Sequence, residues 1–150
     1  VNWRQPGFEQ TDDSPVVFIS HDDAIAYIDW LSKETSKTYS LPTEAQWEYA
    51  CQAGSDSMYS FGDDIASLTE YAWYGANSSA HTHPVAGKKP NAFGLYDMYG
   101  NAWERCLDYF SHSSHAESLP RNPQGPLVGS WHVVKGGGHN LSPADMRLHV

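Results

Sequence analysis

The sequence predicts an α+β fold in which two helices pack around a small twisted antiparallel sheet, with much irregular structure. Three observations support this prediction. Two segments near the N-terminus carry helical periodicity and capping signals, residues 55–100 are rich in turn-forming residues and aromatics, and segments 102–109 and 131–135 read as strands. With 150 residues and 40% hydrophobic content the chain is long enough to bury one core, so we expect one domain over 1–150.

The first predicted helix covers residues 22–35. Asp22 and Asp23 place acidic side chains at its start, where they favour a helix N-terminus. Four apolar side chains fall on one face at helical spacing: Ala24, Tyr27, Ile28 and Leu31. The segment is therefore expected to be an amphipathic helix.

The second predicted helix covers residues 43–53. Thr43 and Gln46 have the spacing of a capping box, and Gly54 fits a C-terminal stop. Pro42 forces the residue before it into an extended conformation. These signals bound the helix at both ends.

The rest of the chain is expected to be mostly loop. Residues 55–100 show no helical period, and their density of aromatics favours ordered loops over disorder, so we expect no continuous helix within 60–100. The strands 102–109 and 131–135 flank a segment, 111–126, that is expected to be a mobile loop.

Charge and cysteine usage exclude several classes of partner. The formal net charge is −9 and no run of Lys or Arg is present, which argues against nucleic acid or an anionic membrane surface as a partner. The longest apolar stretch is far too short to span a bilayer, so no membrane span is expected. Cys51 and Cys106 permit at most one internal disulfide, and no C-x-x-C motif is present.

Long ordered motifs then carry a family resemblance. The stretches "NWRQPGFEQTDDSPVVFIS", "YSLPTEAQWEYACQAG", "YAWYGANS", "THPVAGKKPNAFGLYDMYGNAWE", "NPQGP" and "VVKGGG" resemble the formylglycine-generating enzyme (sulfatase-modifying factor) family. The resemblance implies a variant of the C-type lectin-like fold, with two helices, a small twisted sheet and long loops. Family domains usually begin before this sequence and continue past "MRLHV", so the resemblance implies a truncated domain that missing segments or a second chain would complete.

The stretch "DMYGNAWE", residues 97–104, has two interpretations. From the residues alone it is a turn followed by a strand, with Asp97 capping the turn and Glu104 in solvent. The family resemblance implies instead a structural Ca²⁺ held by the side chains of Asp97 and Glu104 and the carbonyls of Gly100 and Ala102. Ca²⁺ takes six to eight oxygen ligands, and this set supplies only oxygens.

The family's catalytic chemistry is expected to be absent. Enzymes of the family that make formylglycine use two cysteines after a "GGS" motif, and these cysteines bind copper(I), for which thiolates are suitable ligands. Here the segment 136–150 contains no Cys, and Gly138 replaces the serine. We therefore predict no catalytic residues of this type and no bound copper.

Eight histidines allow a different metal site. His21 and His139 stand where many family members have Trp, and His132 where many have Arg. A site formed by His139 with His132 or His21 would suit iron, copper or zinc. Tolerant substitution at half-exposed positions is the preferred interpretation, because no H-x-x-x-H or H-E-x-x-H spacing occurs.

The predicted function is a non-catalytic ligand-binding or accessory domain whose ligand is a protein or a small molecule. The resemblance includes recognition modules, among them variable ligand-binding proteins of diversity-generating retroelements. The expected binding surface combines aromatic and polar residues near the calcium motif: Trp103, Arg105, Trp131, His132, His139 and Asn140. The alternative is an iron- or copper-dependent oxidase or oxygenase of the same family that uses histidines in place of the cysteine pair.

Overall fold

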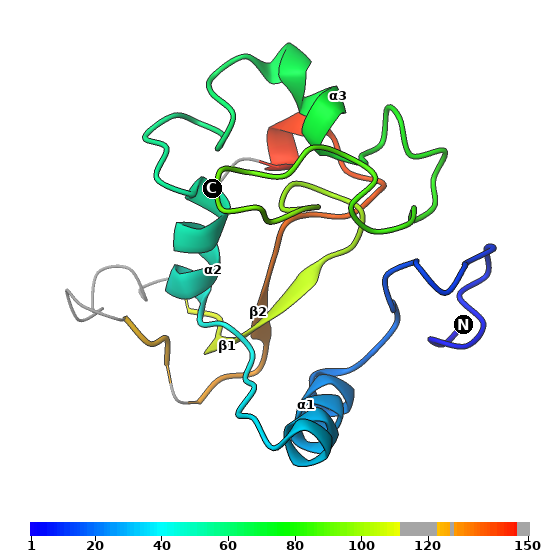
Figure 1. Cartoon of the computed structure of the whole chain (residues 1–150), viewed down its shortest axis with the longest axis vertical. Helices are drawn as coiled ribbons and strands as arrows, with labels where there is room; N and C mark the ends of the chain where they lie inside the picture. Colours follow the sequence, from blue (N-terminus) through cyan, green and yellow to red (C-terminus); the bar gives the residue numbers. More distant parts are fainter. Residues whose placement is uncertain (112–122, 127, 147–150) are drawn as a thin grey trace.

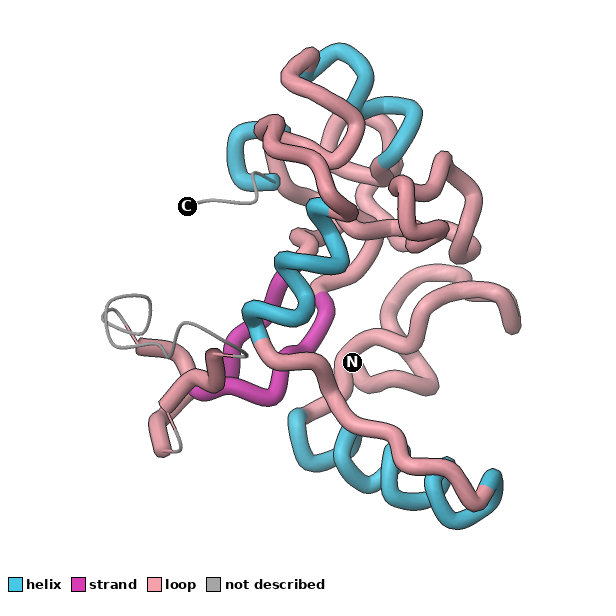
Figure 2. Tube along the Cα trace, turned by 60° about the vertical axis from the view of Figure 1, so that its left-hand side comes forward, coloured by secondary structure: helices cyan, strands magenta, loops and turns pink. Residues whose placement is uncertain are grey.

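The structure is a computed structural model that describes residues 1–111, 123–126 and 128–146. A two-stranded antiparallel sheet lies at the centre of the fold. Strand β1 is Glu104–Tyr109 and strand β2 is His132–Lys135. Irregular segments make up most of the trace around this sheet, as Figure 2 shows. The predicted α+β class and its antiparallel strands are therefore confirmed.

Helix α1 spans His21–Thr35, close to the predicted 22–35. Its N-terminus is fixed by a capping box in which the Ser20 hydroxyl accepts a hydrogen bond from the Asp23 backbone N–H, and the Asp23 carboxylate accepts one from the Ser20 N–H. Only Ala24 of the predicted apolar face is fully buried, whereas Tyr27 is exposed. Figure 1 shows α1 at the lower edge of the molecule, which explains this partial burial.

Helix α2 spans Glu44–Gln52 and packs on the sheet. The predicted capping box is present, because Thr43 and Gln46 exchange side-chain to backbone hydrogen bonds. The helix ends at Ala53 in a left-handed conformation. Its buried side chains, Trp47 and Cys51, belong to the main core.

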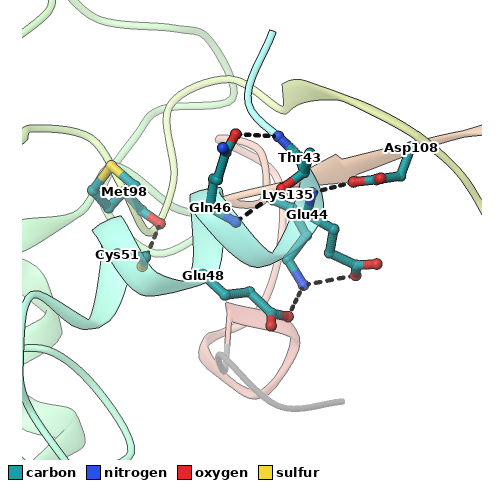
Figure 3. A network of polar contacts seen from close by, with 8 residues as sticks. All are labelled: Thr43, Glu44, Gln46, Glu48, Cys51, Met98, Asp108 and Lys135. Carbon is teal, nitrogen blue, oxygen red and sulfur yellow. Dashed lines mark hydrogen bonds and ion pairs between the residues drawn. The ribbon is translucent and has the colours of Figure 1, made fainter. Parts of the chain in front are cut away.

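Polar contacts join α2 to both strands, as Figure 3 shows. The Lys135 ammonium of β2 lies 3.3 Å from a carboxylate oxygen of Glu44 and 2.7 Å from one of Glu48. Although burial opposes its charge, the hydrogen bond and negative charge of Glu48, together with the charge of Glu44, raise the pKa of Lys135. The Asp108 carboxylate of β1 accepts hydrogen bonds from the backbone N–H groups of Glu44 and Gly125.

The sheet register sets which side chains face the core. Glu104 pairs with Lys135 and Arg105 with Val134, and a bulge follows before Tyr109 pairs with His132. Because side chains alternate between faces, Cys106 and Val133 point into the core, and Arg105 and Val134 point to the opposite face. That second face borders the cleft described below.

The segment 55–100 is largely ordered loop, as predicted, with one exception. A 3₁₀ turn at Ile65–Ser67 continues into helix α3, Leu68–Tyr71, so the expectation of no continuous helix within 60–100 was wrong. The Asp64 side chain accepts a hydrogen bond from the Ala66 N–H at the start of the turn, and Leu68 is fully buried. Local capping and one deeply buried side chain stabilise a helix too short to show a period.

Two remaining predictions concern the loop at 111–126 and membrane-spanning helices. The expected mobile loop at 111–126 lies mostly outside the described residues. No helix in the described part of the chain is long and apolar enough to cross a membrane.

Candidate functional site

The backbone of the 97–104 segment is held in one conformation by close packing. A Cβ at Gly100 would lie 2.2 Å from the Trp73 carbonyl oxygen, so only glycine fits. The next residue, Asn101, has a left-handed φ of 66° and is buried. Its N–H donates to the Trp73 carbonyl, and its side chain bonds both the N–H and the carbonyl of His83. These contacts fix the turn that carries the predicted calcium ligands.

The two predicted carboxylate ligands are half-buried and lack a basic partner. Asp97 Oδ2 accepts a hydrogen bond of 2.9 Å from the Ala86 N–H, whereas its buried Oδ1 has no hydrogen-bond partner of normal geometry among the described residues. The Asn101 side chain is close enough to oppose the rise in the Asp97 pKa. Glu104 Oε2 accepts a bond of 2.6 Å from Trp47 Nε1. Among the described residues, neither carboxylate forms an ion pair.

Burial raises the pKa of both carboxyls, and the negative charge of Asp97 further raises the pKa of Glu104. Asp97 and Glu104 line one cavity of about 380 Å³ together with Gly100 and Ala102. The structure therefore brings all four predicted ligand residues to the same cavity. A buried carboxylate oxygen without a hydrogen-bond partner and two half-buried acids that form no ion pair with a described residue fit a hard cation such as Ca²⁺.

A larger cleft of about 560 Å³ opens beside this cavity. Four of the six predicted binding-surface residues line it: Trp103, Arg105, His139 and Asn140. Its other walls are mostly apolar, and residues 16–19, 41–42 and Val134 are among the residues that form them. Gly138 leaves room for Trp103, since a Cβ there would lie 3.2 Å from the indole ring.

Trp103 lies where three cavities of the site meet. Its side chain is 49% exposed, and it lines the cleft, the 380 Å³ cavity and a third cavity of about 320 Å³ beside α2. The remaining two predicted residues, Trp131 and His132, do not line the cleft. Trp131 projects into solvent with 77% of its surface exposed, and the His132 ring stacks on Tyr109 at a centroid distance of 4.0 Å.

The N-terminal wall of the cleft was not foreseen from the sequence. Phe18 lines it with 56% of its surface exposed and a left-handed φ of 58°, which is rare for a bulky residue. The only signal in the sequence was the apolar run "VVFI" at 16–19, which lies outside both predicted helices. An exposed aromatic in an unfavourable backbone conformation at a cleft is a feature typical of functional sites.

The histidines that the structure describes do not gather into a metal centre. The His21 and His132 rings are stacked and parallel, with centroids 3.4 Å apart, so their nitrogen lone pairs lie in parallel planes and do not converge on one ion. His139 instead packs near Phe8, and its Nδ1 lies 3.3 Å from the Asn101 carbonyl oxygen. Among the described residues, no group of three His, Cys, Asp or Glu side chains is placed to hold a metal.

The two cysteines are separate, buried thiols. No disulfide joins Cys51 to Cys106, and burial raises the pKa of each thiol to about 12. Both thiols are therefore protonated near neutral pH. The described part of the C-terminal segment, 136–146, contributes no thiol to the cleft, so the residues present do not fit a two-thiolate copper centre.

Comparison with known proteins gives one consistent family. Residues 1–150 match the family model described as sulfatase-modifying factor enzyme 1-like domain. The formylglycine-generating enzyme of Streptomyces coelicolor is 36% identical over 93% of this chain and 48% of its own length. The chain spans about half the length, or less, of the curated relatives it matches.

Solved structures support the same assignment. Treponema denticola variable protein 1 superposes with a TM-score of 0.86 at 29% identity, over 96% of this chain and 66% of that one. PvdO from Pseudomonas aeruginosa superposes with a TM-score of 0.82 at 32% identity, over 95% and 57% of the two chains. The predicted family resemblance is confirmed.

Proposed function

The chain belongs to the family of sulfatase-modifying factor enzyme 1-like domains, and on this premise we propose that it is a non-catalytic ligand-binding domain stabilised by Ca²⁺. The observation that carries the proposal is the 560 Å³ cleft, whose apolar walls surround a half-exposed Trp103 and a few polar side chains. Concave, mostly apolar sites with a few placed polar groups are the usual form of a ligand pocket.

The proposed calcium ion would bind the carboxylates of Asp97 and Glu104 and the carbonyls of Gly100 and Ala102. The support is the shared 380 Å³ cavity and the unpartnered Oδ1 of Asp97. When bound, the ion would neutralise two half-buried charges and hold the turn that leads into β1. Since Trp103 lies between the ligand residues, the ion would also fix the floor of the cleft.

We further propose that the protein does not oxidise a substrate cysteine through copper. Support comes from the absence of Cys in 136–150 and from the burial of Cys51 and Cys106. Purified protein supplied with copper and oxygen should leave a sulfatase-type Cys peptide unmodified. Mass spectrometry that detects the aldehyde above a no-protein control contradicts this part of the proposal.

Metal analysis separates the main proposal from its alternative. A ligand-binding module should contain about one Ca²⁺ per chain, whereas the alternative, an iron- or copper-dependent oxidase or oxygenase using histidines, requires stoichiometric iron or copper. Protein purified without chelators and measured by inductively coupled plasma mass spectrometry gives the answer. Stoichiometric iron or copper with catalytic oxygen consumption favours the enzyme.

The cleft itself is tested by ligand screening. Small-molecule fragments and short peptides that bind should perturb the indole NMR signal and the fluorescence of Trp103, and Trp103→Ala should abolish their binding. Trp30→Ala is the matched control, because Trp30 is also about half exposed but lies on α1. Ligands that bind equally well to both variants would place recognition elsewhere on the molecule.

A further inference from the structure

Arg105 is a half-buried cation in the wall of the cleft, and it has no acidic partner among the described residues. We propose that Arg105 makes the cleft selective for an amphipathic carboxylate, a ligand that places its apolar group against the cleft walls and its carboxylate on the guanidinium. The inference rests on the proposed ligand-binding function and names the chemistry of the ligand.

The guanidinium is held at the cleft by two features of the fold. The register of β1 turns Arg105 to the sheet face opposite Glu104, so this strand neighbour does not neutralise it. One amino group, Nη2, donates a hydrogen bond to the Ile19 carbonyl oxygen in the facing wall. The remaining N–H donors are free of any ion pair in the described part of the chain.

The groups around Arg105 do not replace the missing anion. His21, beside it at the start of α1, has its pKa lowered by burial and then by interaction with His132 and Arg105, whereas the charge of Asp22 opposes this shift. Hydrogen bonds from Ser20 and, to a smaller extent, the charge of Arg105 lower the pKa of Asp23, so this acid lies within electrostatic reach of Arg105. Its carboxylate is hydrogen-bonded to Ser20 in the capping box and forms no ion pair with Arg105.

The geometry favours a carboxylate over a phosphate. A guanidinium presents paired N–H donors that match the two oxygens of one carboxylate, and a dianionic phosphate normally requires several cations. Among the described residues, Arg105 is the one Arg or Lys that lines the cleft, and most of the lining is apolar, including Phe8, Phe18, Leu41 and Val134. Glu104 also lines the cleft, but its carboxylate accepts a hydrogen bond from Trp47 and is a ligand of the proposed calcium ion, whose charge would offset it. A carboxylate joined to an aromatic or aliphatic group satisfies both parts of the site.

Two isosteric probes isolate the charge. N-acetyl-phenylalanine carries a carboxylate where N-acetyl-phenylalaninamide carries a neutral amide, and their affinities are measured by isothermal titration calorimetry and by NMR. Wild-type protein should bind the acid about tenfold more tightly than the amide, since a hydrogen bond to a charged group is worth about that factor. Octanoate, as a third probe, shows whether a peptide-like or a fatty-acid source of the carboxylate is preferred.

Arg105→Gln should remove the preference for the acid and leave the affinity for the amide within about twofold. Arg4→Gln is the matched control, because Arg4 lies over the exposed Trp3 ring and does not line the cleft. Circular dichroism and the melting temperature confirm that each variant is folded. If Arg105→Gln does not fold, Arg105→Lys, which keeps the charge but loses the paired donors, should retain only part of the preference.

The outcomes distinguish this inference from the function it rests on. Equal affinity of the wild type for acid and amide, or an undiminished preference in Arg105→Gln, overturns the assignment of Arg105. If the amide binds and Trp103→Ala removes that binding, the ligand cleft survives without a carboxylate preference. Failure of all three probes to bind at concentrations up to about 10 mM counts against both proposals.

Discussion

Replacing Glu104 with glutamine removes one of the two carboxylates of the proposed calcium site while preserving the hydrogen bond that its side chain accepts from Trp47 Nε1. Wild-type protein with Ca²⁺ at about 100 times its dissociation constant should gain roughly 2.7 kcal/mol of stability over chelator-treated protein. In a chain of this length, each kcal/mol of added stability raises Tm by roughly 2–4 °C, so the expected rise in Tm is about 5–11 °C. Glu104→Gln should lose most of that shift.

The structure also predicts how the chelated proteins compare. Burial raises the pKa of Glu104, so its ionised form is unfavourable in the folded state without a cation. The neutral amide should therefore leave the chelated variant as stable as the chelated wild type, or more stable. Differential scanning fluorimetry with excess Ca²⁺ and with chelator measures all four values, and Glu34→Gln, an exposed carboxylate on α1, is the control that should keep the full response.

The response to pH has a defined sign. The folded-state pKa of Asp97 and of Glu104 lies above the ordinary values of 3.8 and 4.5. Without Ca²⁺, the folded protein therefore binds more protons than the unfolded chain at pH values between the ordinary pKa and the raised pKa of each group. Stability of the chelated protein should accordingly fall as the pH rises through the raised pKa values. Ca²⁺ binds the ionised pair, so its stabilising effect should be small near about pH 4 and complete near about pH 7.

Two results would refute this reasoning. The first is an identical melting temperature with and without Ca²⁺ at neutral pH. The second is a full calcium response in Glu104→Gln. Either result returns "DMYGNAWE" to a turn followed by a strand, with two acids that bind no ion.

Three further predictions concern the scaffold. Lys135→Met should lower the free energy of unfolding, measured in urea, by about 3–5 kcal/mol, because it leaves two glutamates of α2 without their cation. The same change at the exposed Lys37 should have little effect. Gly100→Ala should reduce the free energy of unfolding by at least about 2 kcal/mol, since the new Cβ meets a backbone carbonyl oxygen, and a melting temperature close to wild type would show that the turn can relax. Cys51 and Cys106 should resist iodoacetamide near neutral pH in the folded protein and react fully in urea, because burial raises the pKa of each thiol to about 12; rapid alkylation of the native state would contradict the buried placement.

Local sequence signals determined the two longer helices, and the family resemblance implied the proposed calcium ligands. Ser20 with Asp23 and Thr43 with Gln46 form capping boxes across three positions, so each helix start is written in neighbouring residues. The four proposed calcium ligands fall within eight positions of one another, and a glycine turn brings such near neighbours together. The family resemblance rests on the same kind of contiguous motif.

The cleft, in contrast, was decided by the tertiary structure. Its walls come from residues 16–19, 41–42, 103–105 and 138–140, and contacts over such separations depend on packing that no local pattern encodes. His132 does not line the cleft. It lies beyond the bulge in β1 and stacks on His21, which is more than one hundred positions away in the sequence. The sequence names the residue types of the site. Only the folded chain places Arg105 in a mostly apolar cleft wall where it forms no ion pair with a described residue, because side-chain burial and ion pairing are set by long-range contacts.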